Sequence, residues 1–84
     1  MNERHAVRTF LLNLLQRTGD RDGFVDSDSL VMSGRLDSVD TLDLLMFLEE
    51  KYGVDFAQRG FDMNDLDSLD SIMAVIGGAI QASI

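Results

Sequence analysis

Hydrophobic residues near the start of the chain recur at steps of three and four, the spacing that places them on one face of an α-helix. The set comprises Val7, Phe10, Leu11, Leu14 and Leu15. Polar residues fill most of the positions between them, and Gly19 follows at a place that suits the left-handed conformation found just after many helices. The pattern predicts an amphipathic first helix that ends shortly before Gly19.

A second helix is predicted where polar residues that favour helix starts come directly before a long apolar run. Asp37, Ser38 and Asp40 precede the run, and Gly53 follows it as a stop. The simplest interpretation is that Asp37 and Ser38 only cap the helix, which is the usual role of such residues. Ser38 would nevertheless stand at the helix N-terminus, where free backbone N–H groups and the helix dipole favour an anion such as a phosphodiester.

The apolar residues of this second helix fall on two opposite sides when they are placed at about 100° per residue. The side expected to face the core holds Thr41, Leu44, Leu45, Leu48 and Tyr52. The other side holds the apolar residues Val39, Leu42 and Met46 together with the acids Asp43, Glu49 and Glu50. A fold that buries the first side leaves an acid-flanked apolar strip in water, which is typical of a binding surface. The unbranched Met46 suits a surface that accepts several partners.

Residues from about 18 to 36 show no sustained period and are rich in Gly, Asp and Ser, so they predict a long loop. Phe24, Leu30, Val31 and Leu36 are expected to pin this loop to the core. Its acids, Asp20, Asp22, Asp26 and Asp28, suggest a calcium loop at first sight. The spacing fails, because counting from Asp20 or from Asp26 places a valine at the position of the invariant glycine. We therefore expect solvated acids and no metal site.

The remaining chain predicts one short and one longer element. Val54 and Phe56 should turn inward, and a single helical turn is expected around residues 62–66 after a break at Arg59 and Gly60. A last helix, with Ser68 as its N-cap, is indicated by apolar residues at helical spacing. They are Leu69, Ile72, Met73, Ile76, Ala79 and Ile80.

Composition narrows the classes of function. The chain has 84 residues and a formal charge of −8, which disfavours nucleic acid and anionic membranes and favours basic protein surfaces. It has no cysteine, so any thiol that it uses must come from an added group. No signal segment and no apolar run long enough for a membrane span is evident, and we expect a soluble cytoplasmic protein that is a monomer.

The run Leu36-Asp37-Ser38-Val39-Asp40, followed by an acid-rich and leucine-rich helix that ends in Glu49-Glu50-Lys51-Tyr52-Gly53, resembles the acyl carrier proteins. The resemblance implies one carrier domain over residues 1–84. It also implies an all-α, antiparallel four-helix bundle with three main helices, one short helix and a long loop between helices one and two. Val39 replaces the usual leucine, and Arg35 and Arg59 place positive charge in loops that are often neutral or acidic.

The same resemblance assigns roles to residues. Ser38 matches the serine that receives a covalent 4′-phosphopantetheine arm from coenzyme A, and Asp37 matches the residue before it. The positions of the second helix that recognise partners are matched by Val39, Leu42, Asp43, Met46, Glu49 and Glu50. Asp67-Ser68-Leu69-Asp70 is a closer literal match to the Asp-Ser-Leu signature. Only 16 residues follow Ser68, too few for the elements that a carrier needs after its serine, so Ser38 is preferred.

The expected function is that of a carrier that is not itself an enzyme. Its arm would hold acyl or aminoacyl groups as thioesters, and the sequence leaves the cargo open. The expected partners are a phosphopantetheinyl transferase, a loading ligase or transferase, and synthase enzymes with basic docking surfaces. The alternative is a small acidic helical interaction module, or a calcium-sensor-like one, without a prosthetic group.

Overall fold

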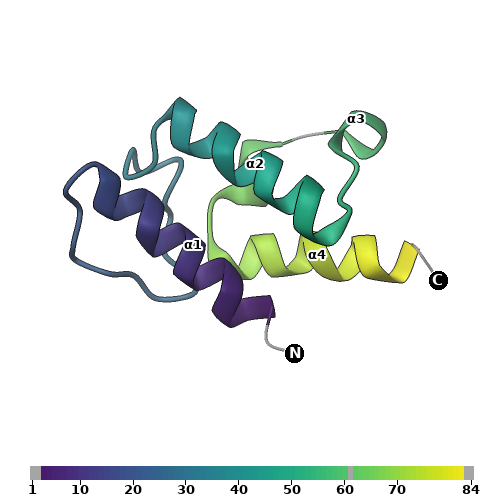
Figure 1. Ribbon diagram of the computed structural model, residues 1–84, viewed down its shortest axis with the longest axis horizontal. Helices are drawn as coiled ribbons and strands as arrows, with labels where there is room; N and C mark the ends of the chain where they lie inside the picture. Colours follow the sequence, from purple (N-terminus) through teal and green to yellow (C-terminus); the bar gives the residue numbers. More distant parts are fainter. Residues whose placement is uncertain (1–2, 61, 83–84) are drawn as a thin grey trace.

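The computed structural model describes residues 3–60 and 62–82, and the whole of this described part is helical or irregular, with no strand. Three long helices carry the fold: α1 (Glu3–Arg17), α2 (Ser38–Tyr52) and α4 (Leu69–Ala82). Two pieces of four residues lie between α2 and α4, namely α3 (Phe56–Arg59) and the 3-10 turn η1 (Met63–Leu66) (Figure 1). The all-helical prediction is therefore confirmed at the level of the three long helices.

The end of α1 is formed as the sequence predicted. Gly19 has a φ of +86°, in the left-handed region that favours glycine. Its N–H donates to the carbonyl of Gln16 at 3.0 Å, and the N–H of Asp20 donates to the carbonyl of Leu15 at 3.0 Å. This pair of bonds is a Schellman motif, which satisfies the last free carbonyls of the helix and turns the chain into the long loop.

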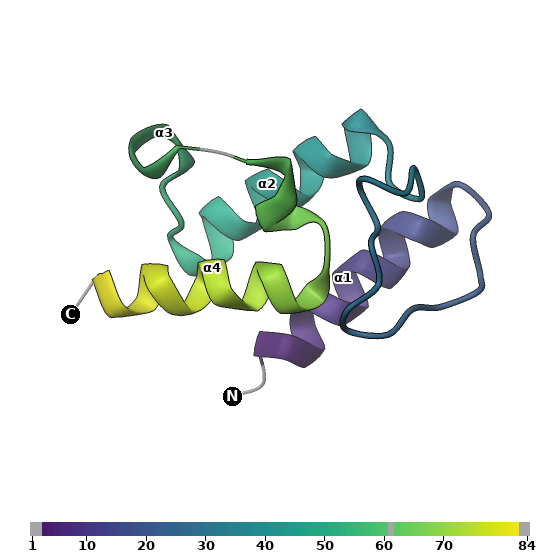
Figure 2. The same cartoon turned by 180° about the vertical axis from the view of Figure 1, so that it is seen from behind.

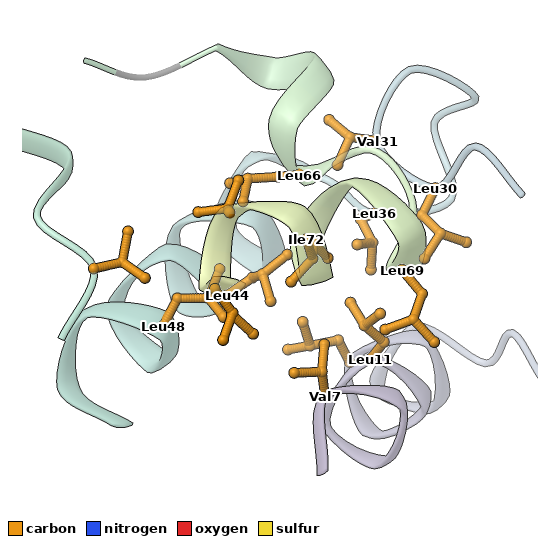
Figure 3. Close-up of a cluster of buried hydrophobic side chains, with 14 of the residues drawn as sticks. Val7, Leu11, Leu30, Val31, Leu36, Leu44, Leu48, Leu66, Leu69 and Ile72 are labelled. Carbon is orange, nitrogen blue, oxygen red and sulfur yellow. The ribbon is translucent and has the colours of Figure 1, made fainter. Parts of the chain in front are cut away.

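One hydrophobic core lies where α1, α2 and α4 pack against one another (Figure 3). The helices contribute the fully buried residues Val7, Leu11, Leu15, Leu44, Leu48, Leu69, Ile72 and Ile76. Leu30 and Leu36 from the long loop, and Leu66 from η1, also enter this core. Those from α1, α2, α4 and the loop are the ones expected from the sequence, so the predicted core is confirmed in its main parts, while Leu66 is an addition that was not predicted.

The long loop is held against α4 by the carboxylate of Asp67. One of its oxygens accepts from the Ser29 hydroxyl at 2.9 Å and from the backbone N–H groups of Val31 and Met32 at 2.9 and 2.8 Å. The backbone N–H of Leu30 donates to the carbonyl of Asp67 at 2.7 Å. Figure 2 shows the loop crossing beside the start of α4. Asp67 thus closes a loop that has no regular structure of its own.

The expectation that the loop acids are solvated is wrong for two of them. Asp26 pairs with Arg4 at 2.6 Å and also with Arg8, both from α1. Asp20 pairs with Arg35, whose guanidinium donates to both carboxylate oxygens at 2.9 and 3.0 Å. The cause is the topology, which lays the loop across the arginines of α1 and folds its two ends together. These carboxylates therefore fasten the loop.

The segment after α2 differs from the prediction. Val54 and Phe56 are buried as expected, and η1 occupies the place of the predicted single turn. The separate piece α3, however, was not foreseen, so two short helical pieces stand where one short helix was expected. The structure consequently does not confirm the four-helix bundle with one short helix. The side chains of Arg59, Ala79 and Ile80 lie outside the described residues.

Asp67→Asn is expected to destabilise the fold near neutral pH and to have much less effect in acid. Burial alone would raise the pKa of Asp67, but hydrogen bonds from Met32, Ser29 and Val31 outweigh it and lower the pKa below its ordinary value of 3.8. A depressed pKa contributes stability that is present above the unfolded value and is lost as the pH falls through the folded one. We expect a loss of roughly 1–2 kcal/mol at pH 7, from charge-assisted hydrogen bonds.

Urea unfolding of the wild type and of Asp67→Asn across the acid range checks this expectation. Asp62→Asn is the matched control, because Asp62 is exposed and, within residues 3–60 and 62–82, its side chain accepts one hydrogen bond, from the N–H of Asn64. Equal losses for the two variants at neutral pH would show that Asp67 is not the clasp of the loop.

Candidate attachment site and docking surface on α2

Ser38 is the first residue of α2 and is exposed to solvent. The residue before it, Asp37, is the N-cap in extended conformation, and its carboxylate accepts from the N–H of Asp40 at 2.8 Å. The Thr41 hydroxyl donates to the carbonyl of Asp37 at 2.8 Å, which fixes the first turn further. The cap is therefore provided by Asp37, and the Ser38 hydroxyl stands at the positive end of a 15-residue helix.

Ser68, the competing serine, is placed differently. It is 91 % buried, since only 9 % of its surface is exposed. Its hydroxyl oxygen accepts from the backbone N–H of Ser71 at 3.1 Å and also lies 3.0 Å from the Ser71 hydroxyl. The N–H of Ile72 donates to the Ser68 carbonyl at 3.0 Å, so Ser68 caps α4 as predicted. An enzyme would have to open this cap to reach the Ser68 hydroxyl.

The two-sided interpretation of α2 is confirmed by burial. Thr41, Leu44 and Leu48 are buried, and Leu45 and Tyr52 are half-buried against the core. On the outer side, Val39, Leu42 and Met46 keep 64, 55 and 47 % of their surface exposed. Glu49 and Glu50 are exposed beside them. We call Val39, Leu42 and Met46 the outer strip of α2.

An apolar groove begins at Ser38. It has a volume of about 200 Å³ and is lined by Ser38, Thr41, Leu42, Leu45 and Met63. Met63, which is 40 % exposed, comes from η1 and was not among the predicted site residues. No periodic pattern marks Met63, because its place depends on how the short pieces after α2 fold back over the helix. The groove therefore joins Ser38 to apolar surface on α2 and η1.

An ion-pair network at the start of α2 was also missed. The guanidinium of Arg17, the last residue of α1, donates to Asp40 Oδ1 at 2.6 Å and to Asp43 Oδ2 at 2.8 Å. Hydrogen bonds to Asp40 and then to Asp43 raise the pKa of Arg17. Only 4 % of the Asp40 side chain is exposed, and its other oxygen, Oδ2, has no hydrogen-bond donor among the residues that the structure describes.

A sequence signal for the burial of Asp40 existed. Asp40 precedes Leu44 and Leu48 by steps of four, which places it on the inner side of α2. Asp43, expected among the partner-recognition positions of the second helix, is partly engaged by the chain's own Arg17. Arg35 is likewise engaged, since it pairs with Asp20 and donates to the carbonyl of Gly23 at 2.7 Å. The hydrogen bond to Arg35 lowers the pKa of Asp20.

Three further observations bound the chemistry of the site. Within residues 3–60 and 62–82, no group of three or more His, Asp or Glu side chains is placed to share a metal ion. None of the helices in that part combines the length and the apolar content needed to cross a membrane. Comparison of the chain with protein-family models, with curated proteins and with solved structures gave no match. A functional conclusion therefore rests on the residues and on their geometry.

Proposed function

We propose that the protein is an acyl carrier whose Ser38 bears a 4′-phosphopantetheine arm. The observation that carries this proposal is the contrast between the two serines in Asp-Ser-φ-Asp contexts, where φ is an apolar residue. Ser38 is exposed at a helix start beside an apolar groove, whereas Ser68 is buried in a cap. The sequence resemblance to carriers selects the same serine on independent grounds.

The residues around Ser38 fit such a group. The oxygen of Ser38 would attack a phosphorus of the coenzyme A diphosphate, with adenosine bisphosphate as the leaving group and the hydroxyl proton passing to the transferase. The new phosphodiester would stand beside the free N–H groups of the first turn of α2, which favour an anion. When attached, the group supplies a thiol that can hold an acyl or aminoacyl chain as a thioester. Leu42, Leu45 and Met63 offer apolar surface next to it.

The proposed carrier is one domain over residues 1–84 in which α1, α2 and α4, with the short pieces α3 and η1, form a variant of the four-helix carrier bundle. It is not itself an enzyme. Its partners would be the transferase, a loading ligase or transferase, and synthase enzymes of a cytoplasmic pathway with basic docking surfaces. The outer strip of α2 would supply apolar contact area, while Asp43, Glu49 and Glu50 would steer the encounter.

Intact-mass analysis tests the proposal. After incubation with coenzyme A, Mg²⁺ and a broad-specificity phosphopantetheinyl transferase, we expect the chain to gain the mass of one phosphopantetheine group. The loaded chain should then react once with a thiol reagent, which the unloaded chain cannot do because it has no cysteine. A chain that stays unloaded with several transferases would contradict the assignment and favour an interaction module without an arm.

Glu49→Lys is expected to slow loading of Ser38 several-fold at low salt, with the effect shrinking as the ionic strength rises. Glu49 is exposed and forms no ion pair among the described residues, so the reversal removes attraction for a basic partner without breaking an internal contact. Loading rates at two salt concentrations measure the effect.

Asp22→Lys is the control for this experiment. Asp22 is exposed in the long loop, and its reversal changes the net charge by the same amount as Glu49→Lys. Equal slowing by both variants would mean that only the total charge matters and that α2 is not the recognised surface.

A further inference from the structure

A second concave surface lies between α1 and α2, with a volume of about 350 Å³. Its apolar part is an aromatic pair, Phe10 from α1 and Phe47 from α2, whose rings stack at 4.1 Å between centroids and 7° between planes. Both rings are only half-buried, and the buried Leu14 lies beside them. We call this surface the α1–α2 groove. Met46, a member of the outer strip of α2, also lines the groove, so the two surfaces are continuous.

The polar part of the α1–α2 groove holds two carboxylates, Asp43 and Glu50, and one cationic side chain, Arg17. Glu50 lines it and forms no ion pair with any residue in the described part of the chain. Asp43 lines it as well, and shares the single guanidinium of Arg17 with Asp40. One arginine therefore serves two carboxylates, and within the described part of the chain no donor reaches Oδ2 of the buried Asp40. The groove therefore combines apolar surface with carboxylate charge that the cations of the described residues do not fully neutralise.

Arg17 indicates what the groove accepts, because this arginine already places a guanidinium against Asp43 within the groove. The aromatic part is compatible with a cation too, since the Nζ of Lys51 lies 5.8 Å from the centroid of the Phe47 ring. The matching partner surface is an apolar side chain with a lysine or arginine about one helical turn away. A second copy of this chain fits poorly, because two chains of charge −8 repel each other.

We propose that the α1–α2 groove docks an amphipathic helix of a partner enzyme, which inserts an apolar side chain beside Phe10 and Phe47 and sets a basic side chain against Glu50 and Asp43. The partner would thereby contact α1 as well as α2. The identity of that partner as an enzyme acting on a carrier rests on the proposed function. The docking chemistry itself rests on the groove alone.

A short helical peptide built from leucine and lysine at helical spacing is the probe, followed by amide NMR shifts of the labelled full chain. Asn13→Trp fills the groove from an exposed position of α1, while Gln16→Trp places the same ring on an exposed position of α1 that does not line the groove. We expect Asn13→Trp to weaken peptide binding about tenfold and Gln16→Trp to leave it unchanged. Melting curves of both variants verify that the fold is kept.

Each outcome decides the proposal. Wild-type shifts centred on Asn13, Phe47 and Glu50, lost in Asn13→Trp and absent with a peptide that carries glutamate in place of lysine, support it. Shifts confined to Val39 and Leu42, equal binding by both tryptophan variants, or concentration-dependent shifts without peptide, which would indicate a second copy in the groove, overturn it. The peptide assay needs no loaded Ser38, so it stays informative if the transferase fails to load the chain, which would count against the carrier function alone.

Discussion

Ser38→Ala is expected to abolish loading completely, whereas Ser68→Ala is expected to load at the wild-type rate and to unfold more easily. The first variant removes the exposed hydroxyl at the start of α2, whereas the other hydroxyl of the first turn, that of Thr41, is buried and donates to the Asp37 carbonyl. It should barely change stability, because Ser38 is exposed and the cap of α2 is provided by Asp37. The second variant removes the cap of α4, which costs about 0.5–2 kcal/mol.

Intact mass after incubation with the transferase, set beside urea unfolding of both variants, separates the two serines in one experiment. The opposite pattern, with loading lost in Ser68→Ala and kept in Ser38→Ala, would mean that the buried cap opens to the transferase. In that case the attachment site lies at the start of α4, and the surfaces assigned to α2 would lose their connection to the arm.

The three long helices and their inner faces could be predicted because they follow from periodicity, which is a local property of the chain. The steps of three and four in α1 appear as expected in the burial of Leu11, and the two sides of α2 appear in the burial of Leu48 and the exposure of Met46. The ends of α1 and α2 were predictable for the same reason, since Gly19 and Gly53 both adopt positive φ where a helix must stop.

What could not be predicted depends on contacts between residues far apart in the chain. Asp26 meets Arg4 and Arg8 only after the long loop has been laid across α1, and no pattern within the loop foretells that. The hydrogen bonds of Asp67 to the backbone of Val31 and Met32 join residues 36 and 35 positions apart, so no local pattern predicts them either. Through such contacts, acidic residues whose sequence suggests a solvated or ligand-binding cluster instead hold the long loop against the rest of the fold.

In the candidate site, too, the features set by one helix could be predicted, and those set by contacts between elements could not. The exposure of Ser38 and of the outer strip followed from the phase of one helix. The engagement of Asp43 by Arg17 did not, because it requires the C-terminal end of α1 to meet the first turns of α2. The contribution of Met63 to the groove at Ser38 required the fold of the segment after α2. The parts of the proposed docking surfaces that lie on two elements are therefore the ones that only the structure supplies.

Leu48→Ala is expected to lower the free energy of unfolding by about 2–5 kcal/mol, the usual cost of emptying a buried leucine site. Leu48 is fully buried in the core between the long helices (Figure 3). A loss of this size would lower the melting temperature of so small a domain by roughly 10 °C or more. Leu48→Val, which removes less volume, should fall between the alanine variant and the wild type.

Met46→Ala is the matched change on the other side of the same helix, only two residues away. Because 47 % of Met46 is exposed, its truncation empties no closed cavity, and we expect its melting curve to lie close to that of the wild type. Loading of Ser38 should nevertheless slow, because Met46 belongs to both the outer strip and the α1–α2 groove. If Met46→Ala unfolds the protein while Leu48→Ala leaves it intact, α2 faces the core with its other side. Neither the outer strip of α2 nor the α1–α2 groove would then be a docking surface.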